Sequence, residues 1–542
     1  MSEIDLADWV EPKDDKVRKF KEPKTPPDVR TFFPLDEFRP FQEETIVAVH
    51  EAFKNNKFVL VEAPTGSGKS PIAATFANQF LADKKRVHIL TVMKVLQEQY
   101  RKDFPNYGCM MGKSAYMGLE DDESCADGIC NRVPKERKAQ LMAVCPYRRS
   151  LAANLVNPCV IHNFDSFFFQ KCVSRQFTDR ELLIIDEAHN IENKFVDFFS
   201  FSIRSDGQYG VKDRKFPVFD EADDYLPIIR EERERLAMEL YQILRKTEEG
   251  TLDIDEYRSA QRLERMVGKM DGFLRKSKGN EFIVDIIDHD SGNTVKFRPV
   301  YANEYVYEAL FDGSQKVLML SATILDKEMF CNNVGLNPEE VPFIQVPSIF
   351  PAKNRPVLAY WDETGSMSYR EIRETLPKMV RAIETIMQKV PNWKGIIHTG
   401  SERVAKYIRD NADRALIRRM TFRKDFYTVD EMLEAHERKP GSFIVASGLK
   451  EGVDLKDDLS RVQIICKVPY LDLSDKRTKR RMTLDRSWYG YMTALLLIQS
   501  FGRSVRSPND RAITYILDSA FQTFYNMNKR FIPDYVRDSL HL

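Results

Sequence analysis

The segment VEAPTGSGKS, residues 61–70, has the residue types of a phosphate-binding loop. Gly66 and Gly68 allow the backbone to curl, so that several N–H groups point at phosphate oxygens. Lys69 can then reach the β- and γ-phosphates of a nucleotide, and the Ser70 hydroxyl can ligate Mg²⁺. The strict pattern has glycine where this chain has Ala63. We expect the nucleotide to be held by Ala63, Pro64, Thr65, Gly66, Ser67, Gly68, Lys69 and Ser70.

A second candidate site lies in ELLIIDEAHN, residues 181–190, where an apolar run ends abruptly in two carboxylates. A buried strand that delivers Asp186 and Glu187 to the edge of a sheet suits a Mg²⁺ site, since strand alternation points them in different directions. Asp186 would hold the metal, and Glu187 would orient and deprotonate the attacking water. His189 could sense the γ-phosphate or contact a second domain, and it is equally consistent with a structural hydrogen bond.

A third set of polar residues lies near the end of the chain, in IQSFGRSVRSPND, residues 498–510. Gln499, Arg503 and Arg506 are spaced three to four residues apart, so a helix would present them on one face. Two arginines directed at a triphosphate could neutralise charge in the transition state. Asp454, in the turn SGLKEGVDL (residues 447–455), follows an apolar strand and is expected at the same cleft.

Short apolar runs, each followed by turn residues and a helical segment, must position these motifs. The first series is 57–63, 86–92, 158–163, 181–188 and 315–323, and the second is 355–361, 394–400, 442–447, 462–468 and 512–518. Such alternation predicts two parallel sheets covered by helices, an α/β fold.

About 130 residues separate the fourth and fifth strands of the first series, too many for an ordinary crossover, so an inserted domain is expected there. A pair of helices within it is predicted from apolar residues at helical spacing: Ile229, Leu236, Leu240, Ile243, Leu263, Met266, Met270 and Phe273.

Lys+Arg and Asp+Glu both total 82 in the 542 residues, so the formal net charge is zero. The composition therefore does not indicate which kind of partner the protein binds. A nucleic-acid enzyme needs only a local basic groove, and the run DKRTKRR, residues 475–481, is either a phosphate contact or a solvated loop. We find neither a signal-peptide core nor a membrane-length apolar stretch, which predicts a cytoplasmic protein without a membrane partner. The charged, proline-containing residues 1–30 are expected to form a flexible arm.

Seven motifs occur in the order typical of superfamily 2 helicases: RPFQEE (39–44), APTGSGKS (63–70), TVMKVLQEQY (91–100), DEAH (186–189), SAT (321–323), SGLKEGVDL (447–455) and QSFGRSVR (499–506). The chain resembles the XPD/DinG-like iron-sulfur DNA helicases. The resemblance implies two RecA-like motor domains, at 31–350 and 351–542. It also implies two inserts in the first, an iron-sulfur domain at 105–165 and a helical arch-like domain at 192–315.

The resemblance further implies an ATP-dependent, Mg²⁺-requiring DNA helicase that moves 5′ to 3′ on single-stranded DNA and unwinds forked DNA. Gln42 would contact the adenine. The catalytic set would be Lys69, Asp186, Glu187, His189, Gln499, Arg503 and Arg506. We expect a monomer with repair or replication proteins as partners. It would associate with the nucleoid, or lie in the nucleus in a eukaryote.

The same resemblance suggests a [4Fe-4S] cluster on Cys109, Cys125, Cys130 and Cys145, four of the eight cysteines. Cys145 begins CPYRRSL, which is similar to the last ligand of the family. Gly118 stands where the family's first ligand usually lies, and Cys109 is the substitute. Zinc is less favoured because close CxxC pairs are missing, and reduced thiols without a cluster are a third possibility. The remaining cysteines, Cys159, Cys172, Cys331 and Cys466, are expected in cores.

Two other functions are consistent with the residues. A DEAH-type RNA helicase would share the motor domains but not the cysteine-containing insert. A nucleotide-switched structural subunit would bind ATP and partners without unwinding, although the complete hydrolytic set argues against it.

Overall fold

The computed structural model describes residues 28–541, apart from residues 121, 174–175, 178–179, 206–214, 278–280, 291, 449–454, 456, 503 and 506–509. The predicted arm at residues 1–30 lies almost wholly outside this range.

The first sheet has seven parallel strands in the order β10-β1-β9-β5-β2-β4-β3. Their bounds are β1 Phe58–Glu62, β2 Val87–Thr91, β3 Gly108–Met110, β4 Cys159–Asn163, β5 Arg180–Asp186, β9 Ser314–Ser321 and β10 Phe343–Gln345.

Alternating side chains of this sheet enter two different cores. Phe58 and Leu60 of β1 pack on one face, and Val59 and Val61 pack on the other, as the period of two along a strand requires. Helices α1 (Gln42–Asn55) and α2 (Lys69–Ala82) cover the second face. The other face is covered by α6 Phe164–Phe168, α7 Ile191–Phe199, α10 Asn303–Val306 and α11 Lys327–Val334.

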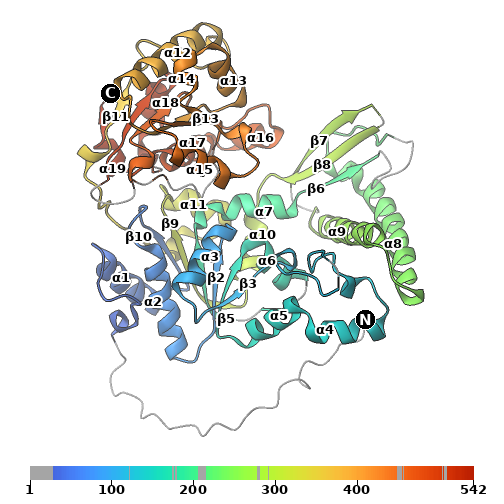
Figure 1. Cartoon of the computed structure of the whole chain (residues 1–542). Coiled ribbons are helices and arrows are strands. Elements are labelled where there is room, and N and C mark those ends of the chain that lie inside the picture. Colours follow the sequence, from blue (N-terminus) through green and yellow to red (C-terminus); the bar gives the residue numbers. More distant parts are fainter. Residues whose placement is uncertain are drawn as a thin grey trace.

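The second sheet is also parallel and seven-stranded, in the order β13-β14-β12-β15-β16-β11-β17. Its strands are β11 Val357–Ala359, β12 Gly395–His398, β13 Met420–Phe422, β14 Phe443–Ala446, β15 Val462–Ile465, β16 Ile513–Ile516 and β17 Leu540–His541. Its helices are α12 Ile372–Lys389, α13 Glu402–Asn411, α14 Arg414–Ile417, α15 Val429–Arg438, α16 Lys476–Leu484, α17 Arg486–Phe501, α18 Ala520–Asn528 and α19 Asp534–Arg537. The two sheet domains are stacked, the second above the first in Figure 1. The predicted α/β class with two parallel sheets is confirmed.

Two segments interrupt the first sheet domain. The shorter lies between β3 and β4 and contains α4 (Lys135–Val144) and α5 (Pro146–Val156), while α3 (Lys94–Asp103) precedes β3. Strands β3 and β4 themselves fall inside the range 105–165 predicted for an insert, yet both belong to the first sheet.

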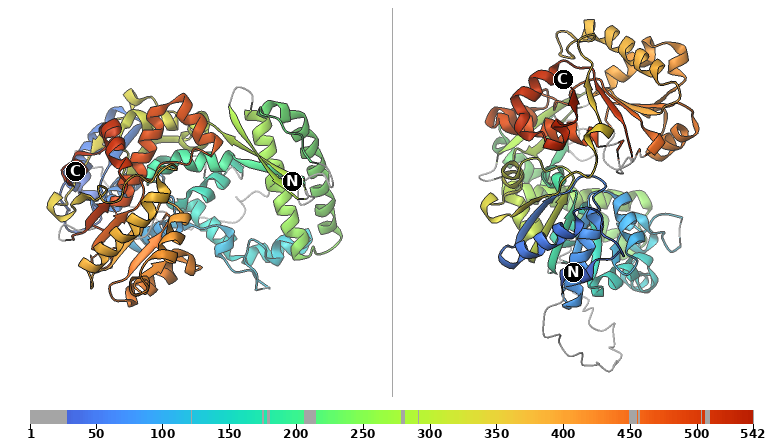
Figure 2. Two further views of the ribbon diagram at one scale, coloured as in Figure 1. Left: turned by 90° about the horizontal axis from the view of Figure 1, so that it is seen from above. Right: turned by 90° about the vertical axis from the view of Figure 1, so that its left-hand side faces the viewer.

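The longer segment follows β5 and contains the predicted helical pair, α8 (Leu226–Glu249) and α9 (Ile254–Lys276). The apolar residues predicted to join these helices are buried or partly buried in one core. An antiparallel sheet that the sequence reasoning did not predict packs against the pair: β6 Phe201–Arg204, β7 Phe282–His289 and β8 Gly292–Pro299. Both segments project to the same side of the first sheet domain (Figure 2).

Candidate functional site

The phosphate-binding loop connects the end of β1 to α2, which begins at Lys69. Gly66 and Gly68 have φ of 82° and 78°, a left-handed conformation that glycine adopts readily. The Arg39 guanidinium donates to Gly66 O at 2.8 Å, and Gln42 Nε2 donates to Gly68 O at 3.1 Å. Gln42, predicted to contact adenine, therefore contacts the loop itself. A Cβ at residue 68 would lie 2.0 Å from Gln42 Nε2, so a larger residue would displace the Gln42 side chain as well as strain the backbone at its positive φ.

The two carboxylates lie where β5 ends, next to β9 and beyond it β1. Asp186 is buried, and its carboxylate accepts from Glu187 N at 3.0 Å and from the Tyr100 hydroxyl at 3.2 Å. Burial and the neighbouring Glu187 raise the pKa of Asp186, and Lys69 opposes this shift. A bound divalent cation would favour the ionised carboxylate.

Glu187 adopts a strained backbone conformation, with a positive φ of 54°. A positive φ is uncommon in a residue other than glycine, and strained residues of this kind cluster at functional sites. It turns the Glu187 side chain toward the phosphate-binding loop, where Oε1 lies 3.7 Å from Lys69 Nζ. The residue predicted to activate water thus faces the residue predicted to hold the γ-phosphate.

His189 joins three motifs that are far apart in the sequence. Its Nδ1 lies 2.7 Å from Ser321 Oγ of the SAT segment, and its Nε2 lies 2.7 Å from Gln499 Nε2 on α17. The amide nitrogen of Gln499 is a donor, so these contacts are satisfied together when the proton is on Nδ1. Gln499 also donates to Thr323 Oγ1 at 3.3 Å.

A cavity of about 330 Å³ lies between the two sheet domains at this point. Pro64, Thr65 and His189 line it from the first domain, and Gln499 and Gly502 line it from the second. The predicted loop, carboxylate and Gln499 segments therefore meet at one cleft. Arg503, Arg506 and Asp454 lie outside the described residues.

Two buried residues that the sequence reasoning did not single out support the site. The Glu62 carboxylate accepts from the backbone N–H groups of Ile324 at 2.8 Å and Leu325 at 2.5 Å, fixing the loop after SAT beside β1. Tyr100 holds Asp186, as described. Tyr100 is the last residue of TVMKVLQEQY and follows the buried Gln97 by three positions. Helical spacing therefore places both residues on one face of the helix, and this was the sequence signal that could have identified Tyr100.

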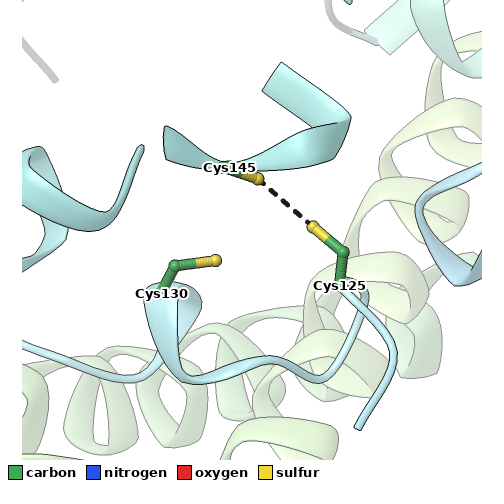
Figure 3. A group of neighbouring side chains, drawn as sticks. All are labelled: Cys125, Cys130 and Cys145. Carbon is green, nitrogen blue, oxygen red and sulfur yellow. Dashed lines mark hydrogen bonds between the residues drawn. The ribbon is translucent and has the colours of Figure 1, made fainter. Parts of the chain in front are cut away.

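Three of the four predicted cluster ligands come together. The sulfur atoms of Cys125, Cys130 and Cys145 lie within 4.8 Å of one another, and all three residues are buried (Figure 3). The Cys125 and Cys145 sulfurs are 3.5 Å apart. Burial is the largest cause of the raised pKa of Cys125 and Cys130, and the neighbouring Cys145 thiol adds to it in both.

The predicted ligand Cys109 lies outside this group of three thiols. Cys109 lies on β3 in register with Ile161 of β4, so sheet pairing fixes it at the edge of the first sheet. Its thiol contacts Met111 Sδ at 3.8 Å. Among the side chains that the structure describes, the metal-competent group around Cys125 contains three thiols and not four. A [4Fe-4S] cluster on the four predicted cysteines does not fit this arrangement.

The other cysteines with described side chains, Cys159, Cys331 and Cys466, are buried in the cores of the two sheet domains, as predicted. The side chain of Cys172 lies outside the description.

The basic run at residues 475–481 is not a solvated loop, because most of it is helical and two of its arginines are buried. It forms the start of α16, where Arg477 and Arg481 are buried. The Arg477 guanidinium pairs with Glu192 of α7 at 2.8 Å, and Arg481 donates to Asn333 of α11 at 2.8 Å. Arg480 is exposed and pairs with Glu281. This helix therefore binds the second sheet domain to the first.

The cysteine-containing segment touches the long helical insert. Arg258 of α9 lies 3.1 Å from carboxylate oxygens of both Asp127 and Glu123. Gln261 Nε2 donates to Ala126 O at 2.9 Å, and Leu252 N donates to Arg132 O at 2.8 Å. The two inserts are thus joined at their outer ends.

Two family models match separate parts of the chain. The model described as "Helicase C-terminal domain" matches residues 383–538, and that described as "Type III restriction enzyme, res subunit" matches residues 35–205. A probable ATP-dependent helicase of Methanocaldococcus jannaschii is 22% identical over 91% of this chain and 93% of its own length.

Solved structures share the fold at low identity. A structure titled "XPD_Helicase" has a TM-score of 0.63 and 16% identity over 92% of this chain and 98% of its own. The structure of S. tokodaii Xpd4 has a TM-score of 0.58 and 15% identity over 93% and 100%. Within the described residues, every helix is too short or too polar to cross a membrane.

Proposed function

We propose that this chain uses ATP hydrolysis to move along single-stranded DNA and to separate forked duplexes. The basis is its resemblance to XPD-like superfamily 2 helicases in domain matches, in fold and in a helicase relative. Membership of a helicase family already implies an ATP-hydrolysing enzyme. The proposal adds the DNA track, 5′ to 3′ movement and strand separation.

The contact between Gln499 and His189 carries the proposal. Gln499 belongs to the second sheet domain and His189 follows the DEAH carboxylates of the first, so the two domains meet beside the cleft. A nucleotide bound there would contact both domains, and its hydrolysis would change how they pack. Opening and closing of such a cleft is how ATP-driven motors convert chemistry into movement.

Each polar residue of the cleft has a role in this scheme. Lys69 and the loop N–H groups would bind the phosphates, and Ser70 and Asp186 would hold Mg²⁺. Glu187 would take the proton of the attacking water, and Tyr100 would keep the Asp186 carboxylate in place. Asp454, Arg503 and Arg506 lie outside the described residues, and their roles at the cleft and on the triphosphate stay predictions.

DNA is preferred over RNA because the structural likeness extends over 92% of the chain and so includes both inserts. A DEAH-type RNA helicase is expected to share the motor domains alone. The joined inserts lie beside the first sheet domain, where they could direct one strand away from the other.

The test is an unwinding assay with ATP on DNA duplexes that carry a 5′ or a 3′ single-stranded tail, together with ATPase measurements on single-stranded DNA and RNA. We expect unwinding of the 5′-tailed duplex and stronger stimulation by DNA. Lys69→Ala is the matched control, since it should abolish ATPase while strand binding persists. Stimulation by RNA alone would favour an RNA helicase, and strand-stimulated ATPase without unwinding of either duplex would overturn strand separation.

A nucleotide-switched structural subunit is the second candidate. It would bind ATP tightly with turnover that single strands leave unchanged. Light scattering of the purified protein tests the monomer expected here, and co-purification tests for repair or replication partners.

A further inference from the structure

We propose that Cys125, Cys130 and Cys145 form a site for a single tetrahedral metal ion of the Zn²⁺ class, in place of the iron-sulfur cluster that the family resemblance suggests. The site has three cysteine ligands and leaves the fourth position to water or a small exogenous ligand.

The separation of the sulfur atoms supports a single ion. At a Zn–S distance of about 2.3 Å, two sulfurs of a tetrahedron lie about 3.8 Å apart. The three sulfurs here lie within 4.8 Å of one another, and one pair is 3.5 Å apart. In a [4Fe-4S] cluster each thiolate binds a different iron, and bridging sulfides separate the irons, so the ligand sulfurs are held farther apart.

Cys125 and Cys130 lie on one loop, and Cys145 faces them from the start of a helix (Figure 3). Cys125 N donates to Tyr116 O at 2.7 Å, and the Asn131 side chain donates to Cys125 O at 2.9 Å. Cys130 lies in the short helical turn Ile129–Asn131. Cys145 is the N-cap of the 11-residue helix α5.

Gly118 stands close to the cysteine loop without a thiol. A Cβ placed on Gly128 would lie 3.5 Å from Cys125 Cα and from Gly118 Cα, so residue 118 lies next to the cysteine loop. Gly118 provides no side chain at this place. In the part of the chain that the structure describes, no fourth His, Cys, Asp or Glu belongs to the group.

Metal content of the full chain is the first measurement. We expect about one zinc per chain and little iron or acid-labile sulfide after anaerobic purification. X-ray absorption at the zinc edge should give three sulfur neighbours and one oxygen or nitrogen neighbour. Replacement of zinc by Co²⁺ should give the visible absorption of a tetrahedral thiolate site. In a parallel arm, Fe²⁺ and sulfide are added anaerobically to metal-free protein, which should stay colourless.

Variants test the ligand set. Cys125→Ser and Cys145→Ser should lower the metal content at least about 10-fold, whereas Cys109→Ser is the matched control and should keep it. Gly118→Cys adds a thiol beside the loop and should raise the number of sulfur neighbours from three to four. This variant removes no ligand, so it remains informative if the serine variants fail to fold.

A brown protein with about four irons and sulfides per chain would overturn the proposal. The proposal would also be overturned if the chain bound neither zinc nor cobalt, or if Cys109→Ser lost its metal. These measurements need neither ATP nor DNA, so their failure would leave the proposed helicase function standing.

Discussion

His189 shows at the scale of single residues how the cleft is assembled. Its two ring nitrogens contact Ser321 and Gln499, so one imidazole connects the carboxylate motif, the SAT segment and the second sheet domain. From the sequence, His189 could sense the γ-phosphate, contact the second domain or make a structural hydrogen bond. The contacts favour the interdomain alternative, and the catalytic roles of the cleft residues stay predictions.

Gln499→Ala should weaken the communication between the domains. Removing the amide deletes its contacts to His189 and Thr323, and we expect strand-stimulated turnover to fall about 2- to 30-fold, with ATP binding retained. Ser500→Ala is the matched control, because the Ser500 hydroxyl bonds only within α17 among the contacts described, to Leu496 O. Steady-state ATPase with and without single-stranded DNA measures the effect. Equal loss in both variants would contradict the prediction.

Glu187→Gln should bind Mg-ATP but stall before hydrolysis. The amide keeps the shape of the side chain but cannot take a proton, so kcat should fall by about 10² to 10⁴. Nucleotide binding measured with a fluorescent ATP analogue should be preserved, because Lys69, Ser70 and Asp186 are unchanged. Normal turnover by this variant would place the base elsewhere.

At the scale of elements, long apolar strands were predictable and short edge strands were not. All ten predicted apolar runs contain strands, because buried parallel strands are continuous apolar segments. The missed strands β3, β10, β13 and β17 lie at the edges of the two sheets and have three residues or fewer. The antiparallel β7 and β8 were missed inside a segment dominated by helical spacing.

Helix α16 could not be interpreted correctly from sequence, since a run such as KRTKRR is usually solvated. Its buried arginines find partners far away in the chain, Glu192 for Arg477 and Asn333 for Arg481. Glu192 accepts from Arg477 and also lies 3.4 Å from the Trp488 indole nitrogen. Interdomain pairing of this kind leaves no local pattern.

Glu192→Gln should destabilise the protein by about 3–5 kcal/mol, because it leaves the buried Arg477 without its counter-charge. Arg480→Ala is the matched control on the same helix. Its pair with Glu281 is exposed and screened by water, so this variant should melt close to the unsubstituted protein. Thermal unfolding followed by circular dichroism compares the two. Similar melting temperatures for both variants would mean that the buried pair contributes nothing.

At the scale of the whole molecule, the predicted resemblance to XPD-like superfamily 2 helicases is confirmed by the domain matches and the shared fold. The order of the motifs was enough to predict this resemblance, because each motif marks a strand end or a helix of the two sheet domains. The contact between the two inserts was not predictable, since it depends on how both project from the first sheet domain.

Arg258→Ala should uncouple unwinding from ATP hydrolysis. It removes the ion pairs that join α9 to Asp127 and Glu123, far from the cleft, so ATPase should change less than about 2-fold while unwinding falls at least about 3-fold. Arg235→Ala is the control, because Arg235 pairs only within α8 among the described contacts. Equal unwinding by both variants would show that the join is dispensable.

The position of β9 between β1 and β5 affects how the chain folds while the ribosome synthesises it. Residues 187–313 must be synthesised after β5 before this central strand exists, which takes on the order of ten seconds at typical elongation rates. During that interval β1 and β5 lack their shared neighbour, and their open edges could pair with other nascent chains. A chain truncated after residue 313 should therefore aggregate, whereas one truncated after residue 350 should be more soluble, as sedimentation of lysates would reveal.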